Sequence, residues 1–98
     1  MQVVISGRHT HLRDGEKDII EEKLHKYEKK VSGLTKTEVV INVEGDRHLI
    51  EIIGHVAHSN PLVAHAEATS NLAALDLAVQ KMDNLVSKLN SKRNDHHK

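Results

Sequence analysis

The sequence predicts a two-layer α+β domain, a β-α-β-β-β-α sandwich in which two helices pack on one face of a four-stranded sheet. Two observations carry this prediction. Four short segments are rich in β-branched residues and end at glycine or turn-forming residues, and two longer segments repeat apolar residues at helical spacing. Their order then suggests the topology: a helical crossover makes the first two strands parallel, and short turns make the remaining strands an antiparallel meander.

The first half of the chain contains one strand and one helix. Residues 2–8 (QVVISGR) form the expected strand, which ends near a glycine. In the next segment, apolar residues recur at i, i+4, i+7 and i+11, so they lie on one stripe of a helix that Gly33 is suited to end. The stripe consists of Ile20, Leu24, Tyr27 and Val31.

Three strands follow. Residues 36–45 and 47–56 alternate in part and are predicted to form a hairpin that turns at Gly45-Asp46. The Ser-Asn-Pro sequence at 59–61 is a loop signal, and residues 62–69 alternate again as the fourth strand.

The last helix is expected to begin at a cap formed by Ser70 or Asn71 and to end near Leu89 or Asn90. Residues 91–98 (SKRNDHHK) are polar and are expected to be a disordered tail, which leaves residues 1–90 as a single domain. The apolar stripe expected to face the sheet contains Leu72, Leu75, Val79, Met82, Val86 and Leu89.

Composition excludes several classes of protein. Apolar residues make up 38% of the 98-residue chain and charged residues 29%, as in one globular domain. The apolar runs are far shorter than the roughly 18–20 residues of a membrane span, and no secretory signal is evident. The chain has no cysteine, so it has no disulfide or zinc-thiolate site. A cytoplasmic protein is expected.

The charged residues are sorted along the helices although the formal net charge is zero. Zero net charge argues against a nucleic-acid partner, because phosphate neutralisation normally requires a basic domain. At about 100° per residue, however, lysines gather on one flank of each apolar stripe and acids on the other. The lysines are Lys23, Lys26 and Lys30 in the first helix and Lys81, Lys88 and Lys92 in the last; the acids are Glu21 and Glu28, then Asp76 and Asp83.

This sorting has three possible explanations. The charges could be ordinary solvated faces with i,i+4 pairs. If the helices lie parallel, the lysine flank of one could face the acidic flank of the other as an internal salt-bridge seam. Alternatively, the lysines could form a basic ridge that binds a polyanion, with the acids on the far side. The pattern alone leaves the three open.

Other kinds of site find little support. No nucleophile elbow, P-loop or dinucleotide motif is present, so no catalytic residue and no cofactor is predicted. The nine histidines match no metal-binding motif, and no metal site is expected, although His96 and His97 could bind adventitious metal. The chain lacks Phe and Trp, so any RNA binding would rely on phosphate contacts and shape instead of base stacking.

Five segments stand out in order along almost the whole chain: MQVVISGR, LRDGEKDIIEEKLHKYEKKV, VVINVEGDRHLIEI, HAEA and AALDLAVQKMD. Together they resemble the ribosome hibernation-promoting factors and ribosome-associated inhibitors, in their short form. The sequence departs from the family at Gly54, where an apolar strand residue is usual, and after Lys81, where the family has more closely spaced lysines.

The resemblance implies a non-enzymatic inhibitor of translation that occupies the decoding channel of the small ribosomal subunit during stationary phase or stress. The implied partner is 16S-type ribosomal RNA, with no DNA, membrane or cofactor, and the free protein is expected to be monomeric. A structural or protein-interaction module that uses the open sheet face is the alternative. The residues that correspond to RNA-binding positions are Arg8, Arg13, Lys23, Lys26, Lys30, Arg47, Lys81, Lys88, Lys92 and Arg93.

Overall fold

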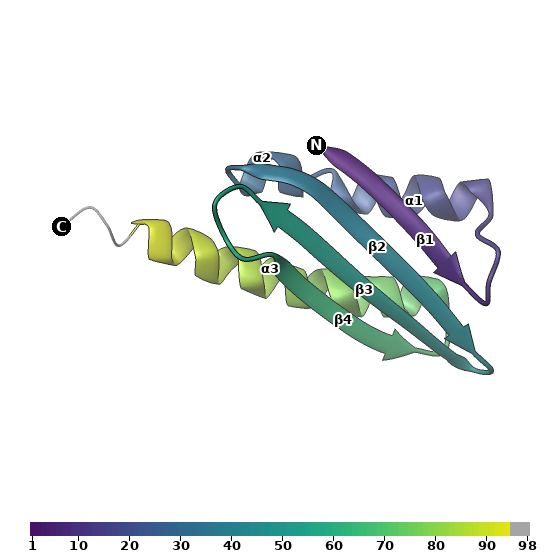
Figure 1. Cartoon of the computed structure of the whole chain (residues 1–98). Coiled ribbons are helices and arrows are strands. Elements are labelled where there is room, and N and C mark those ends of the chain that lie inside the picture. Colours follow the sequence, from purple (N-terminus) through teal and green to yellow (C-terminus); the bar gives the residue numbers. More distant parts are fainter. Residues whose placement is uncertain (95–98) are drawn as a thin grey trace.

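Four strands form one mixed sheet in the computed structural model, which describes residues 1–94 (Figure 1). The strands lie in the order β1-β2-β3-β4, with β1 and β2 parallel and the other neighbours antiparallel. The predicted crossover and meander are therefore confirmed. The strands are β1 (Gln2–Arg8), β2 (Leu34–Glu44), β3 (Arg47–Val56) and β4 (Leu62–Ala68).

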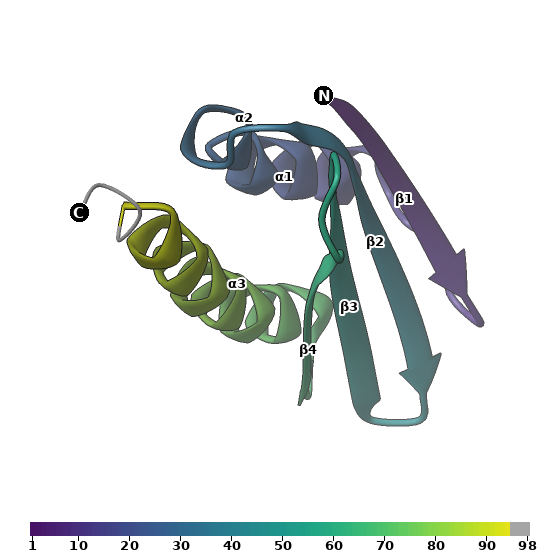
Figure 2. The same cartoon turned by 60° about the vertical axis from the view of Figure 1, so that its left-hand side comes forward.

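The helices cover one face of this sheet and leave the other face open (Figure 2). They are α1 (Asp14–Leu24), α2 (Tyr27–Lys30) and α3 (Asn71–Asn94). The first predicted helix is thus interrupted at His25 and Lys26, where the N–H of Glu28 bonds to the carbonyl of His25 at 3.2 Å, three residues back. Both residues keep right-handed helical backbone angles, so the apolar stripe still faces the sheet.

Helix α3 begins as predicted but runs further. The hydroxyl of Ser70 caps it by accepting the N–H of Ala73 at 3.1 Å. The helix continues to Asn94, beyond the expected end at Leu89 or Asn90, because its last turns are bonded to the end of α2 and to the α2–β2 connection: Asn90 donates to the carbonyl of Lys30 and Arg93 to that of Ser32, both at 3.0 Å. Disorder at residues 95–98 stays a prediction, since they lie outside the described part.

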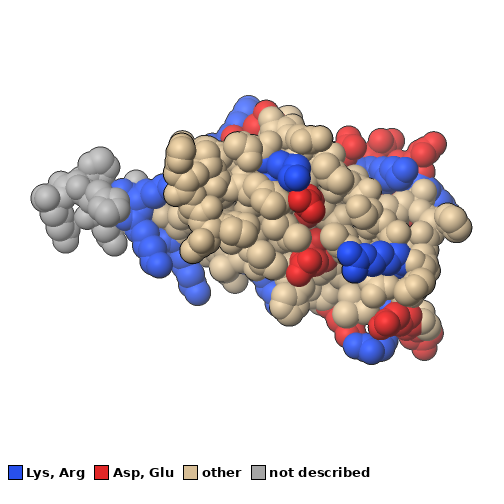
Figure 3. Space-filling view, in the orientation of Figure 1, with Lys and Arg blue, Asp and Glu red and all other residues tan. Residues whose placement is uncertain are grey.

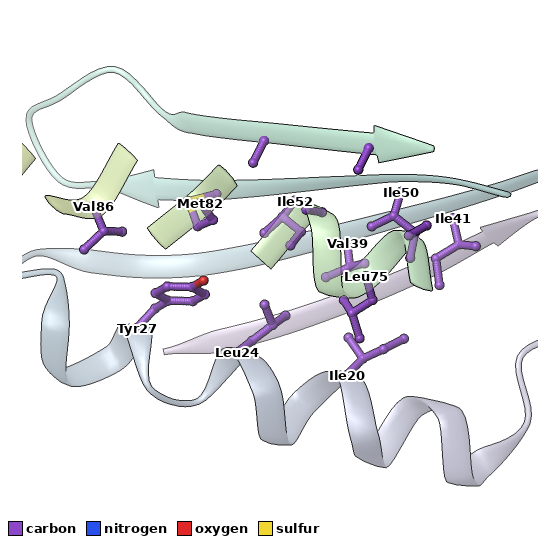
Figure 4. Packing of buried hydrophobic residues seen from close by; sticks show 14 of the residues in the cluster. Ile20, Leu24, Tyr27, Val39, Ile41, Ile50, Ile52, Leu75, Met82 and Val86 are labelled. Atoms are coloured by element: carbon purple, nitrogen blue, oxygen red, sulfur yellow. The ribbon is translucent and has the colours of Figure 1, made fainter. Parts of the chain in front are cut away.

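One apolar core fills the space between sheet and helices (Figure 4). Leu24, Val39, Ile41 and Leu75 are fully enclosed in it. In β2, alternate side chains from Thr37 onward point to the helices, as the period of a strand requires.

The predicted stripe of α3 is wrong at one end. Leu72 is 43% exposed, whereas Ala74 and Ala78 have no exposed surface. The buried face of α3 therefore begins with Ala74 and Leu75 instead of Leu72. Among the helices described, none is long and apolar enough to span a membrane.

Candidate functional site

The ten predicted cations do not form one continuous face. Helices α1 and α3 both begin at the end of the sheet where β1 finishes, so they run in parallel (Figure 1). Because the charges of both helices are sorted with the same hand, the lysine flank of α1 faces the acidic flank of α3. The cations consequently lie in three places: Lys23, Lys26 and Lys30 beside α3; Arg8, Arg13 and Arg47 at the end of the sheet; and Lys81, Lys88, Lys92 and Arg93 along α3.

The first group forms an interhelical seam, which we define as Lys23, Lys26, Asp76 and Asp83. The ammonium of Lys23 lies 3.1 Å from the carboxylate of Asp76, and that of Lys26 lies 3.0 Å from Asp83. The seam alternative therefore describes these two lysines. All four side chains remain partly exposed, between 37% and 59%.

Tyr27 anchors the inner side of this seam. Its ring is buried in the core, as predicted, and its hydroxyl donates to Asp83 at 2.7 Å and to the carbonyl of Val79 at 3.3 Å. Lys26 lies over the ring, 5.2 Å from its centroid. This cluster was not predicted from the sequence, although a tyrosine in an apolar stripe signals a hydroxyl that needs a partner.

The cluster shifts two pKa values. Burial, and then the hydrogen bond to Asp83, raise the pKa of Tyr27 well above its usual range. Partial burial alone would raise the pKa of Asp83, but hydrogen bonds from Tyr27 and Lys26 and the charges of Lys26 and Lys30 bring it below its usual value. Asp83 is thus an ionised acceptor held between two donors.

The three arginines at the end of the sheet differ in whether they bind other residues of the protein. Arg47 binds Glu67 in a bidentate manner, at 2.9 and 3.2 Å, and lowers the pKa of that carboxyl. Arg13 precedes α1, and its backbone N–H donates to Glu16 at 3.4 Å. Arg8 ends β1 and is exposed. Arg47 is therefore committed to an internal pair.

A different environment surrounds the lysines on the other side of α3. Lys81 donates to the carbonyl of His65 in the edge strand β4 at 2.9 Å, whereas Lys88 makes no hydrogen bond or ion pair within residues 1–94. A shallow hollow between α3 and β4 is lined by these lysines and has no carboxylate in its lining. We call this surface the α3–β4 flank and define it as His65, Lys81, Asn84 and Lys88.

Basic and acidic side chains are scattered among uncharged residues on the open face of the sheet (Figure 3). The same view shows cations gathered at the end of α3. On this sheet face Glu38 accepts from His55 at 2.9 Å and from Lys36 at 3.1 Å, and these bonds, Lys36 first, lower the pKa of Glu38. Val63 is 43% exposed there.

Three histidines of the described residues, His9, His48 and His55, contact different polar side chains. His9 has a φ of 58° and contacts Asn42 at 3.3 Å. His48 contacts Asn71 at 2.6 Å. Across residues 1–94, no three acidic or histidine side chains converge as metal ligands would, and His96 and His97 lie outside this range.

Comparisons with known proteins define the class. The model of the family described as "Sigma 54 modulation protein / S30EA ribosomal protein" matches residues 3–94. The chain belongs to this family. Among curated proteins it is 34% identical over 93 residues to a ribosome hibernation promoting factor of Azotobacter vinelandii, covering 95% of this chain and 86% of that protein. It is also 30% identical to that of Pseudomonas putida, over 95% and 90% of the two chains.

Solved structures show the same fold. A ribosomal subunit interface protein from Coxiella burnetii superposes with a TM-score of 0.82 at 16% identity, over 93% of this chain and 99% of that one. The N-terminal domain of Thermus thermophilus Protein Y gives 0.80 at 23% identity, over 91% and 99%. At these identities the likeness concerns the fold, and it confirms the predicted α+β sandwich.

Proposed function

We propose that this protein is a ribosome hibernation factor: it binds the small ribosomal subunit, occupies the decoding channel and silences idle ribosomes in stationary phase or stress. The observation that carries the proposal is the similarity to hibernation promoting factors over nearly the whole of both chains. The cytoplasm, where ribosomes work, is the corresponding location, and the free protein is proposed to be a monomer.

The mechanism needs no chemistry. A folded domain that fills a channel excludes mRNA and tRNA by volume, and cations on its surface hold it by contacts to phosphate. The exposed cations along α3 support this, because Lys88 has no internal partner among the described residues. The core stripe alone does not require Lys81 or Lys88, since neither is buried.

Co-sedimentation with purified small subunits at low and high salt tests the proposal. Lys81→Glu/Lys88→Glu is expected to weaken binding by at least about tenfold near 0.1 M salt, because phosphate contacts are replaced by repulsion. Lys17→Glu/Lys29→Glu is the matched control: it makes the same change in net charge at exposed positions outside the ten predicted cations.

Two results would contradict the proposal. If wild type does not pellet with the subunits at low salt, the ribosome is not the partner. If the folded Lys81/Lys88 variant pellets as well as wild type, the α3 cations are not the contact. Subunit-independent binding of another protein, lost on Ile53→Asp in the middle of the open face, would instead favour the open sheet face as an interaction surface.

A further inference from the structure

We propose that Asp76 attenuates RNA binding: it neutralises Lys23, so phosphates are held mainly by the α3–β4 flank, and the interhelical seam contributes little. This inference rests on the proposed function and specifies which part of the cationic surface carries the affinity.

The seam is electrically balanced. The groove between α1 and α3 is lined by Ile19, Glu22, Lys23, Lys26 and Val79. Its two lysines are paired with Asp76 and Asp83 at 3.1 and 3.0 Å, and Glu22 adds a further negative charge. Lys30 lies near enough to Asp83 to lower its pKa. Lysines and acids are thus matched in number along the groove.

A balanced seam offers little to a phosphate. Any phosphate that approaches the ammonium of Lys23 also approaches the carboxylate of Asp76, so attraction and repulsion largely cancel. RNA binding gains affinity from each phosphate that a cation neutralises with release of counterions. A lysine that already has a carboxylate partner therefore adds little to this gain.

The α3–β4 flank is not balanced in this way. No carboxylate lines the hollow between Lys81, Lys88 and β4. Two acids lie on the open side of the sheet close to this flank: Glu67 is held by Arg47, and Glu51 of β3 pairs with His65 of β4. Glu51 and Glu67 line a neighbouring hollow that Lys81 also borders, whereas Lys88 lines only the hollow without a carboxylate.

Asp76 can be substituted to test its charge, because its side chain has no structural role in the packing of α3 on the sheet within residues 1–94. Its side chain is 59% exposed, and Lys23 is its one ion-pair partner within the described chain. Asp83, in contrast, also accepts from the buried Tyr27. Replacement of Asp76 by the isosteric Asn therefore frees Lys23 while leaving the packing of α3 on the sheet intact.

The test is the salt dependence of binding to purified small subunits. We expect Asp76→Asn to bind roughly five- to tenfold more tightly near 0.1 M salt and to steepen the log–log salt slope by about 0.7–0.9, one phosphate contact. Lys88→Gln should flatten the slope by a similar amount. In the wild-type background, Lys23→Gln should change the salt slope by less than half of the Lys88→Gln effect. In the double variant with Asp76→Asn, Lys23→Gln should cancel the gain in affinity that Asp76→Asn produces alone.

Asp18→Asn is the matched control, because it removes one negative charge from an exposed position of α1 with no ion pair in the described chain. A gain equal to that of Asp76→Asn, or a gain that survives Lys23→Gln, would show a general charge effect and overturn the inference. The inference would also be overturned if Lys23→Gln flattened the salt slope as much as Lys88→Gln does. In each case wild-type binding would leave the proposed function standing, whereas absence of wild-type binding would refute that function itself.

Discussion

Gly54 leaves room in the core that a methyl group can occupy. It lies on the helix-facing side of β3, where the residues around it, including Tyr27, Leu34 and Met82, enclose a small apolar cavity. A Cβ at Gly54 would lie 3.4 Å from Leu34 and 3.9 Å from Leu62, which is ordinary contact. Glycine in a strand also costs conformational entropy on folding.

Gly54→Ala is therefore expected to stabilise the protein by about 0.5–1 kcal/mol, through lower entropy of the unfolded chain and added packing. Urea unfolding measures the change. Gly45→Ala provides the control: space is open there, but φ is +61°, so alanine should destabilise by about 1 kcal/mol. Loss of stability at Gly54 would mean that the cavity walls cannot accept the methyl group.

At the level of residues, periodicity predicted burial well and ion pairing poorly. Ile20, Leu24, Tyr27 and Val31 are buried as expected, because a stripe of that spacing can face only one way. The partners of Lys23 depended on which neighbour α1 has and in which direction that neighbour runs. Sorting of charge within each helix indicated a seam as one of three alternatives, and only the packing of the two helices distinguishes them.

At the scale of secondary-structure elements, the contact between α1–α2 and α3 depends on a few polar groups. Tyr27 and Lys26 sit at the break between α1 and α2, and both reach Asp83 of α3. The break itself was not predicted, since no glycine or proline marks it. The longer α3 was not predicted either, because its last turns are stabilised by bonds to residues distant in sequence, Lys30 and Ser32.

Asp83→Asn is expected to destabilise the protein by about 1 kcal/mol, since the charge-assisted bonds from Tyr27 and Lys26 are weakened in a half-exposed setting. Tyr27→Phe should cost a similar amount by removing one of these donors. The double variant should cost less than the sum, because both changes remove the same bond. Thermal unfolding with all three variants tests this; strict additivity would show that the two residues are not coupled.

At the scale of the whole molecule, carboxylates with lowered pKa values connect separate parts of the fold. Asp83 joins the helices, Glu38 joins β2 to His55 of β3, and Glu67 joins β4 to Arg47 of β3. In each case the pKa is lower in the folded protein than the usual value of about 4 for a free carboxyl. The ionised forms therefore favour folding.

The protein is expected to lose stability at acid pH. Stability from these groups is present above about pH 4–5 and is lost as the pH falls through the lowered folded-state values, because the unfolded chain takes up protons first. The free energy of unfolding from urea titrations should thus be nearly flat between about pH 5 and 7 with respect to these carboxylates and should decline below about pH 4. Asp83→Asn should show a shallower decline; an unchanged acid slope would exclude Asp83 as a contributor.

Helix α3 projects past the sheet, which makes the molecule 51 Å long and about 20 Å across (Figure 1). Residues 84–94, the C-terminal half of α3 that includes the projecting end, contain three cations and no acid. A particle of zero net charge can still experience a torque in an electric field if its positive charge is gathered at one tip. Near a polyanion this protein would turn before it is drawn in, so that the tip of α3 arrives first and the approach is aligned along its long axis.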